Sequence, residues 1–188
     1  MKVVGLSGSK VGTKTRTALD YTIKSVTENY PATQTTLIDL ADFDIQFSDG
    51  RNYLEYEGDT KYVLQSLMEA DAIIMGTPIF QASIPATLKN IFDLLPENAF
   101  RDKVVSMLVT AGSPKHYLIV EQQLKPILGY MKAQIVQTYL FIEEKDFHRK
   151  EITNDDVLFR IDRLVEDTIL LTETYKQIRE AKEAEYDF

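Results

Sequence analysis

The sequence contains no cysteine. This absence excludes disulfide bonds, thiolate catalysis, cysteine-ligated zinc and iron–sulfur clusters. It suits a cytoplasmic protein, and we expect that location. No apolar run approaches the roughly 18 residues that a membrane span requires. The amino terminus has no basic segment followed by an apolar core, as a secretory signal would have. We therefore expect no membrane partner.

Basic residues are also scarce relative to acidic ones. The chain has 21 Lys and Arg against 29 Asp and Glu, which gives a net charge of −8. Because nucleic-acid-binding proteins normally present a basic face, we expect no nucleic-acid partner. Net charge concerns solubility rather than any one pocket, so a local site for a small anion is still compatible with this composition.

The length of 188 residues lies within the usual range for one domain, about 50–250 residues. A globule of this size buries roughly 70% of its unfolded surface, so it needs neither a metal nor a disulfide to fold. No repeat, low-complexity linker or run of like charges divides the chain. We predict a single domain over residues 1–188.

Short apolar runs alternate with helical patterns along the chain. The apolar runs predict strands at residues 3–6, 35–40, 72–76, 103–110 and 134–142. Apolar residues spaced three and four apart predict helices at residues 15–28, 61–70, 85–95, 117–131 and from 155 onward. Together they predict an α/β fold: a doubly wound five-stranded parallel sheet in the order 2-1-3-4-5, with helices on both faces. Ligands of such sheets bind at the carboxyl ends of the strands, which makes the loops after strands one, three and four candidate site loops.

The first loop, "GSKVGTKTR", joins the first strand to the first helix. Its polar side chains are Ser9, Thr13, Lys14, Thr15 and Arg16. The helix that follows directs free N–H groups and its positive end back at this loop, an arrangement that binds anions. The glycine spacing is neither that of a Walker A loop nor that of G-x-G-x-x-G, so an ATPase or an ordinary Rossmann dehydrogenase is disfavoured. Two interpretations stand: a phosphate cradle, or a turn with Thr13 as N-cap.

The second loop begins "TPIFQ". Pro78 breaks the strand, and Ile79 and Phe80 form an apolar edge on which a flat aromatic ligand can rest. Thr77 and the backbone supply polar contacts, and the loop ends at Gln81. The alternative is that Phe80 belongs to the core.

The third loop begins "TAGSPKHY". Thr110, Ala111, Gly112 and Ser113 leave the sheet with little side-chain bulk, so their backbone N–H groups can approach a ligand closely. His116 is either the start of a helix or a chemical group, and the residues favour neither.

At these three loops the sequence resembles the NAD(P)H-dependent FMN reductase family, which has a flavodoxin-like fold. The stretches Gly8-Ser9 and Thr13-Lys14-Thr15 are similar to the family's phosphate loop. The second loop and its helix are similar to the family signature P-x-(Y/F)-x-x-S-x-P-x-x-L-K-x-x-x-D. The matching residues are Pro78, Phe80, Ser83, Pro85, Leu88, Lys89 and Asp93. The middle of the chain is closest to the flavin reductase component of two-component alkanesulfonate monooxygenases, and the resemblance spans about residues 1–142.

The resemblance implies an enzyme that transfers a hydride from NAD(P)H to FMN. FMN phosphate would be bound by Ser9, Thr13, Lys14, Thr15 and Arg16. Loops 77–81 and 110–113 would flank the isoalloxazine ring. The chemistry belongs to the flavin, so no catalytic side chain and no metal is expected.

The resemblance further implies a homodimer or homotetramer, with a flavin-dependent monooxygenase as a possible receiver of reduced FMN. Segment 41–59 and the apolar side of helix 85–95 are candidates for the subunit interface. Tyr53 and Tyr56 would either cover a neighbouring chain's site or be ordinary surface aromatics.

Three rival functions are compatible with the same loops. One is a quinone or azo-compound reductase that retains FMN. The second is a non-catalytic flavodoxin-like electron carrier, and the third is a non-catalytic flavin sensor. The sequence leaves the choice between NADH and NADPH open.

Overall fold

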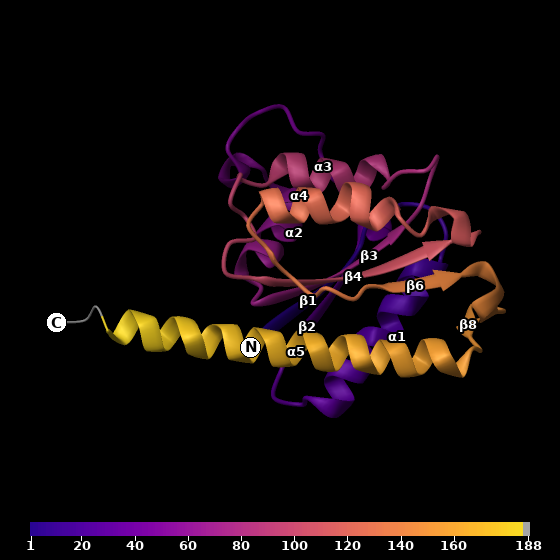
Figure 1. Ribbon diagram of the computed structural model, residues 1–188. Coiled ribbons are helices and arrows are strands. Elements are labelled where there is room, and N and C mark those ends of the chain that lie inside the picture. Colours follow the sequence, from indigo (N-terminus) through magenta and orange to yellow (C-terminus); the bar gives the residue numbers. More distant parts are fainter. Residues whose placement is uncertain (186–188) are drawn as a thin grey trace.

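A parallel sheet forms the centre of the computed structural model, which describes residues 1–185 (Figure 1). Its order is β2-β1-β3-β4-β5, and β6 also pairs with β4, so the predicted fold class and strand order are confirmed. The strands are β1 (Lys2–Ser7), β2 (Gln34–Asp39), β3 (Ala72–Pro78), β4 (Val104–Ala111), β5 (Gln134–Ile135) and β6 (Leu140–Glu143). A short antiparallel pair, β7 (Phe147–His148) and β8 (Glu151–Ile152), follows. The last three residues of the predicted domain, 186–188, lie outside the described residues.

Helices cover both faces of the sheet (Figure 1). One layer holds α1 (Lys14–Asn29) and α5 (Asp155–Ala184). The other layer holds α2 (Gly58–Glu69), α3 (Ala86–Leu94) and α4 (Lys125–Tyr130). Strand β3 is buried along its whole length, and its successive residues Ile73 and Ile74 belong to the two different apolar clusters. Successive side chains of a strand point to opposite faces, so these strands need apolar residues at every position.

The prediction of one continuous fifth strand over residues 134–142 is wrong in the middle of that range. The strand is split into β5 and β6, and both pieces pair with β4. Between them, the carbonyl of Gln137 accepts a hydrogen bond from Lys125 Nζ (2.9 Å) instead of a strand neighbour. Tyr139 turns toward α4, and its hydroxyl donates to the carbonyl of Tyr117 (2.8 Å).

The predicted helix 117–131 is also less regular than expected. A 3-10 turn spans Pro114–His116, and a π-helical turn spans Val120–Leu124 before α4 begins. Lys125 N–H donates to the carbonyl of Val120, five residues back. The next residue, Pro126, has no N–H to continue an α-helical ladder, which is the local reason for a wider turn here.

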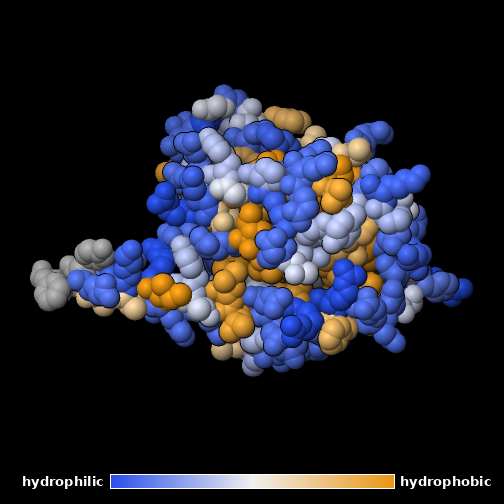
Figure 2. Space-filling model, viewed as in Figure 1, coloured by the Kyte–Doolittle hydropathy of each residue, from blue (hydrophilic) through white to orange (hydrophobic). Residues whose placement is uncertain are grey.

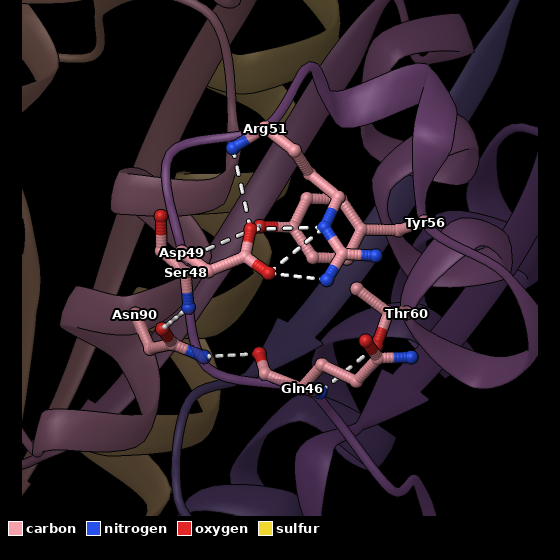
Figure 3. Close-up of polar contacts among 7 residues, drawn as sticks. All are labelled: Gln46, Ser48, Asp49, Arg51, Tyr56, Thr60 and Asn90. Carbon is pink, nitrogen blue, oxygen red and sulfur yellow. Dashed lines mark hydrogen bonds and ion pairs between the residues drawn. The ribbon is translucent and has the colours of Figure 1, made fainter.

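Segment 41–59 is fixed to its own chain by polar contacts (Figure 3). Asn90 of α3 accepts from the N–H of Ser48 (3.0 Å) and donates to the carbonyl of Gln46 (2.9 Å). The Tyr56 ring is only 1% exposed, and its hydroxyl donates to Asp49 (2.9 Å). The segment is therefore anchored to its own chain at Gln46, Ser48 and Tyr56, while most of its other residues are exposed.

These contacts decide the place of Tyr56. Segment 41–59 as a subunit interface stays a prediction, with Phe47 79% and Leu54 59% exposed on it. Tyr56 is buried within its own chain, so it cannot cover a neighbour's site. The apolar side of α3, including Leu88 and Ile91, is likewise buried against the sheet. Tyr53 is half-buried and packs on the same cluster.

The long helix α5 extends beyond the sheet that it covers. Its buried residues end at Thr172, and its last turns project beyond the body (Figure 1). The projecting end has a mostly hydrophilic surface on the face shown in Figure 2. Among residues 1–185, no helix combines the length and apolar character needed to cross a membrane.

Candidate active site

A cavity of about 570 Å³ opens at the carboxyl ends of the strands. This is the edge at which doubly wound sheets bind ligands, and the volume is that of a small-molecule site. All three loops chosen from the sequence contribute to its lining. The predicted residues that line it are Thr13, Lys14, Thr15, Pro78, Ile79, Phe80, Thr110, Ala111 and Gly112.

The amino-terminal end of α1 forms one side of this cavity. Thr13 stands at the N-cap position but makes no side-chain capping hydrogen bond, and the first turn contains no acidic residue. The interpretation of Thr13 as the N-cap residue is therefore confirmed in position, but its side chain does not cap the helix. The first backbone N–H groups of a helix need a partner from outside it, and here the positive end of α1 faces the cavity without one of its own. Gly12, at φ +83°, turns the chain into the helix where a Cβ would meet nothing within 4 Å.

Short contacts hold the first loop against the other two. Thr15 Oγ1 and Thr110 Oγ1 lie 2.7 Å apart in a buried hydrogen bond that joins α1 to β4. The N–H of Gly8 donates to the carbonyl of Gly76 (2.8 Å), and Thr87 Oγ1 donates to the carbonyl of Gly8 (2.6 Å). These contacts are made within the chain itself, so the cavity wall is preformed.

The second loop presents an apolar edge to the cavity. Backbone hydrogen bonds in both directions (2.9 Å each) close the turn between Phe80 and Ser83. Gln81 and Ala82 in the turn have positive φ angles of 49° and 57°. Phe80 is 40% exposed, so the interpretation of Phe80 as a core residue is wrong. Ile79 beside it is half-buried, and both line the cavity.

The other predicted site residues do not line the cavity: Ser9, Arg16, Thr77, Gln81 and Ser113. Ser9 Oγ donates to the carbonyl of Val11 (2.8 Å) and accepts from its N–H (3.1 Å), which folds the first loop. Thr77 is fully buried, and its hydroxyl donates to the carbonyl of Pro78 (2.9 Å). Ser113 accepts from the N–H of Lys115 (3.3 Å) at the start of the 3-10 turn.

Arg16 is held by three carboxylates rather than left free for a phosphate. Its guanidinium lies 3.1 Å from Asp20, 3.5 Å from Asp39 and 3.3 Å from Asp42. Partial burial lowers the pKa of Arg16, but the hydrogen bond and charge of Asp20, with the charges of the other two, outweigh it and raise the pKa overall. Arg16 therefore ties α1 to the end of β2.

The sequence reasoning missed a fourth loop, which follows β6. Ile142, Glu144 and Phe147 line the cavity, and so do Val11 and Gly12 of the first loop. The rule that selected the other loops also applied here, because "IEEKDF" leaves the fifth strand at the same edge. Glu144 forms an ion pair with Lys14 across the cavity. The hydrogen bond from Lys14 and its charge lower the pKa of the Glu144 carboxyl.

The cavity thus has two chemically different parts. Lys14, the threonine hydroxyls and the helix N–H groups form a cationic, donor-rich part, whereas Ile79, Phe80 and Phe147 belong to an apolar part. A phosphate fits the first and a flat aromatic ring fits the second, so the residues present fit FMN. Lys14 and Glu144 are the ionisable groups of the lining. Within residues 1–185, no group of three or more potential metal ligands is placed to hold an ion.

The doubly wound sheet, with a cavity at its carboxyl edge that has a cationic part beside an apolar part, defines a flavodoxin-like fold with a site of the kind that binds nucleotides. More narrowly, the chain belongs to the family described as NADPH-dependent FMN reductase, whose family model matches residues 1–147.

Named relatives agree with this family. The chain is 36% identical over 165 residues to an NAD(P)H-dependent FAD/FMN reductase of Geobacillus thermodenitrificans, which covers 87% of this chain and 89% of that protein. It is 28% identical over 161 residues to the NADH-dependent FMN reductase SfnF of Pseudomonas fluorescens, covering 86% of each. Among solved structures, the apo form of an NADH:FMN oxidoreductase (EMOB) superposes with a TM-score of 0.74 at 26% identity. That match covers 90% of this chain and 88% of the other.

Family membership confirms the resemblance seen in the sequence. The protein is an oxidoreductase, and its cofactors are FMN and a nicotinamide nucleotide.

Proposed function

We propose that this chain transfers a hydride from NAD(P)H to FMN bound in the cavity described above. The observation that carries the proposal is the uncapped amino terminus of α1, which opens on the same cavity as the apolar edge of Ile79 and Phe80. One ligand with a phosphate at one end and a flat ring at the other satisfies both.

We assign the phosphate to Thr13, Lys14, Thr15 and the N–H groups of the first turn of α1. A helix terminus with an adjacent lysine binds a phosphate without a metal. The sequence expectation also included Ser9 and Arg16. We now assign these two to the support of the loop and of α1, because their polar atoms are engaged elsewhere.

We assign the ring of FMN to the second and third loops. Pro78, Ile79 and Phe80 offer an apolar surface, and the backbone of Ala111 and Gly112 offers donors for the polar edge of the ring. The flavin accepts the hydride, and the chain's part is to hold the two rings in register. Direct hydride transfer requires no general base, which agrees with the expectation of no catalytic side chain. Thr77, Gln81 and Ser113 shape these loops in the same proposal.

Reduced FMN is proposed to leave and serve a flavin-dependent monooxygenase. The support is the sequence similarity to sulfonate-type reductases and the similarity to a reductase named SfnF. A homodimer or homotetramer is part of the same proposal, and light scattering of the purified protein measures it. The cytoplasmic location stays a prediction.

The test is oxidation of NADH and NADPH by purified protein, with free FMN titrated in under air. Saturable turnover that follows added FMN supports the proposal and reveals the preferred nicotinamide. Lys14→Met should raise the KM for FMN. Lys10→Met is the matched control, because Lys10 belongs to the same loop but is exposed and does not line the cavity.

Other outcomes select the rivals. Tight FMN binding without reduction by either nicotinamide favours the carrier or the sensor. Retained FMN with ping-pong kinetics against a quinone favours the quinone reductase. Absence of FMN binding rejects the site.

A further inference from the structure

Glu144 occupies the mouth of the cavity opposite the phosphate-binding part. It reaches Lys14 from the far side of the sheet edge, although 130 positions separate the two residues in the sequence. The first turn of α1 has no acidic residue, so Glu144 is the acidic side chain of the cavity lining. Its Oε2 would also lie 3.9 Å from a Cβ added at Gly112, which places the carboxylate between the first and third loops.

The backbone that carries Glu144 is fixed. The buried carboxylate of Asp146 accepts from the N–H of Glu143 (2.9 Å) and from Asn154 Nδ2 (2.7 Å), closing the turn after β6. Asn154 in turn caps α5 by accepting from the N–H of Asp156 (3.0 Å). Among the described residues the Glu144 side chain has no such tie: it is 67% exposed, and its partner there is Lys14. The backbone of this turn is therefore fixed, whereas the Glu144 side chain is free to rotate away from Lys14.

The carboxylate of Glu144 and the phosphate of a bound flavin would compete for the same cation, Lys14. A flavin phosphate at the terminus of α1 needs the ammonium of Lys14, which the carboxylate of Glu144 already holds. Like charges only a few ångströms apart repel, so the carboxylate must leave Lys14 when a phosphate binds. The cost of that exchange is subtracted from the affinity for any phosphate-bearing flavin.

We propose that Glu144 competes with the phosphate of FMN for Lys14 and thereby weakens FMN binding and speeds FMN release. The inference rests on the proposed function, because it places the phosphate at Lys14. In a reductase that releases reduced FMN as a product, this competition would help one FMN to leave and the next to bind.

The test compares binding of FMN and of riboflavin by fluorescence quenching in the wild type and in Glu144→Gln. The substitution keeps the shape and removes the charge. FMN should bind about five- to tenfold more tightly to the variant, the size expected for one exposed charge contact together with relief of a repulsion. Riboflavin has no phosphate, so its Kd should not change. Stopped-flow displacement should show that the gain lies in slower release of FMN.

Glu69→Gln is the matched control. Glu69 also forms an exposed ion pair, with Lys2 (2.9 Å), its side chain is 64% exposed, and it does not line this cavity. Its substitution should leave both flavin affinities unchanged. Glu144→Ser serves as a second variant without the carboxylate.

Each remaining outcome decides against the inference. An equal FMN Kd in the wild type and Glu144→Gln overturns it while the proposed function stands. Weaker FMN binding by the variant means that Glu144 holds the flavin, and tighter binding of both flavins means that its effect is steric. If neither the wild type nor the variants bind FMN, the proposed function fails and the inference fails with it.

Discussion

Thr15 and Thr110 share one buried hydrogen bond, with their hydroxyl oxygens 2.7 Å apart, although 95 positions separate them in the sequence. The bond joins the first turn of α1 to the carboxyl end of β4, and both residues line the cavity. Two of the predicted site loops are therefore held together by a contact between their own side chains.

Thr110→Val should destabilise the protein by about 1–3 kcal/mol, because it leaves the buried hydroxyl of Thr15 without a partner. Urea unfolding at neutral pH measures the loss. The double variant Thr15→Val/Thr110→Val should be closer to the wild type than Thr110→Val, since it removes both polar groups. Equal or greater loss in the double variant would contradict this account.

Gly76→Ala should destabilise by about 1–3 kcal/mol through overpacking. Its Cβ would lie 2.7 Å from Leu19 Cδ1 and 3.0 Å from Thr15 Cγ2, where α1 crosses the sheet. Gly129→Ala is the control, because a Cβ there meets nothing within 4 Å and the residue lies in α4. It should stabilise by about 0.5–1 kcal/mol, since alanine favours the helix. Thermal unfolding of both variants should show shifts of opposite sign.

Asn90→Ala should release the loop around Ser48. It removes the hydrogen bonds to Ser48 N–H and to the Gln46 carbonyl, and we expect a loss of about 1–3 kcal/mol. Faster amide exchange at Ser48 checks the local effect. Asp93→Asn, which breaks an exposed ion pair with Lys89 on the same helix, should change stability by less than about 0.5 kcal/mol. Unchanged exchange in Asn90→Ala would mean that the other contacts of the loop, such as Gln46 N–H to Thr60 Oγ1 (2.9 Å) and Ser48 Oγ to the Asp93 carbonyl (3.0 Å), hold it without Asn90.

The stability of the wild type should fall more steeply at alkaline pH than that of Tyr139→Phe. Burial, and then contacts with Tyr117, raise the pKa of the Tyr139 phenol above its usual 10.0. The folded state keeps the proton that the unfolded state loses, so this contribution is complete below pH 10 and declines as the pH rises further. At pH 8 the variant should be less stable by about 1 kcal/mol, because the Tyr117 carbonyl loses its donor. Urea titrations at pH 8 and pH 10.5 should show the difference narrowing.

Gly112→Leu should weaken FMN binding at least about tenfold without loss of stability. Among residues 1–185, and apart from the neighbours of Gly112 in the chain, the one atom within 4 Å of an added Cβ is Glu144 Oε2, at 3.9 Å. The side chain therefore has room in the free protein but fills part of the cavity. A tenfold change corresponds to about 1.4 kcal/mol of binding free energy. Fluorescence quenching by FMN and a thermal scan give the two values. Unchanged affinity would remove the third loop from the flavin site.

The sequence by itself determined the sheet and most of the cavity wall. Continuous apolar runs such as that of β3 occur where both faces of a strand are buried, and the alternation of strands with helices then permits few topologies. The carboxyl-edge rule selected the loops of Thr15, Phe80 and Gly112, and all three line the cavity. These are local properties of the chain, and a reader of the sequence has direct access to them.

Only the tertiary structure decided which side chains face the cavity. Arg16 and Lys14 look alike in the first loop, but Arg16 meets carboxylates from β2 and its following turn, whereas Lys14 meets Glu144 from beyond β6. The same holds for Tyr56, which is buried in an apolar cluster shared with residues of α2 and α3, and for the break in the fifth strand at Gln137. A cation's partner and an aromatic's exposure depend on residues tens of positions away, and only the folded chain brings these together.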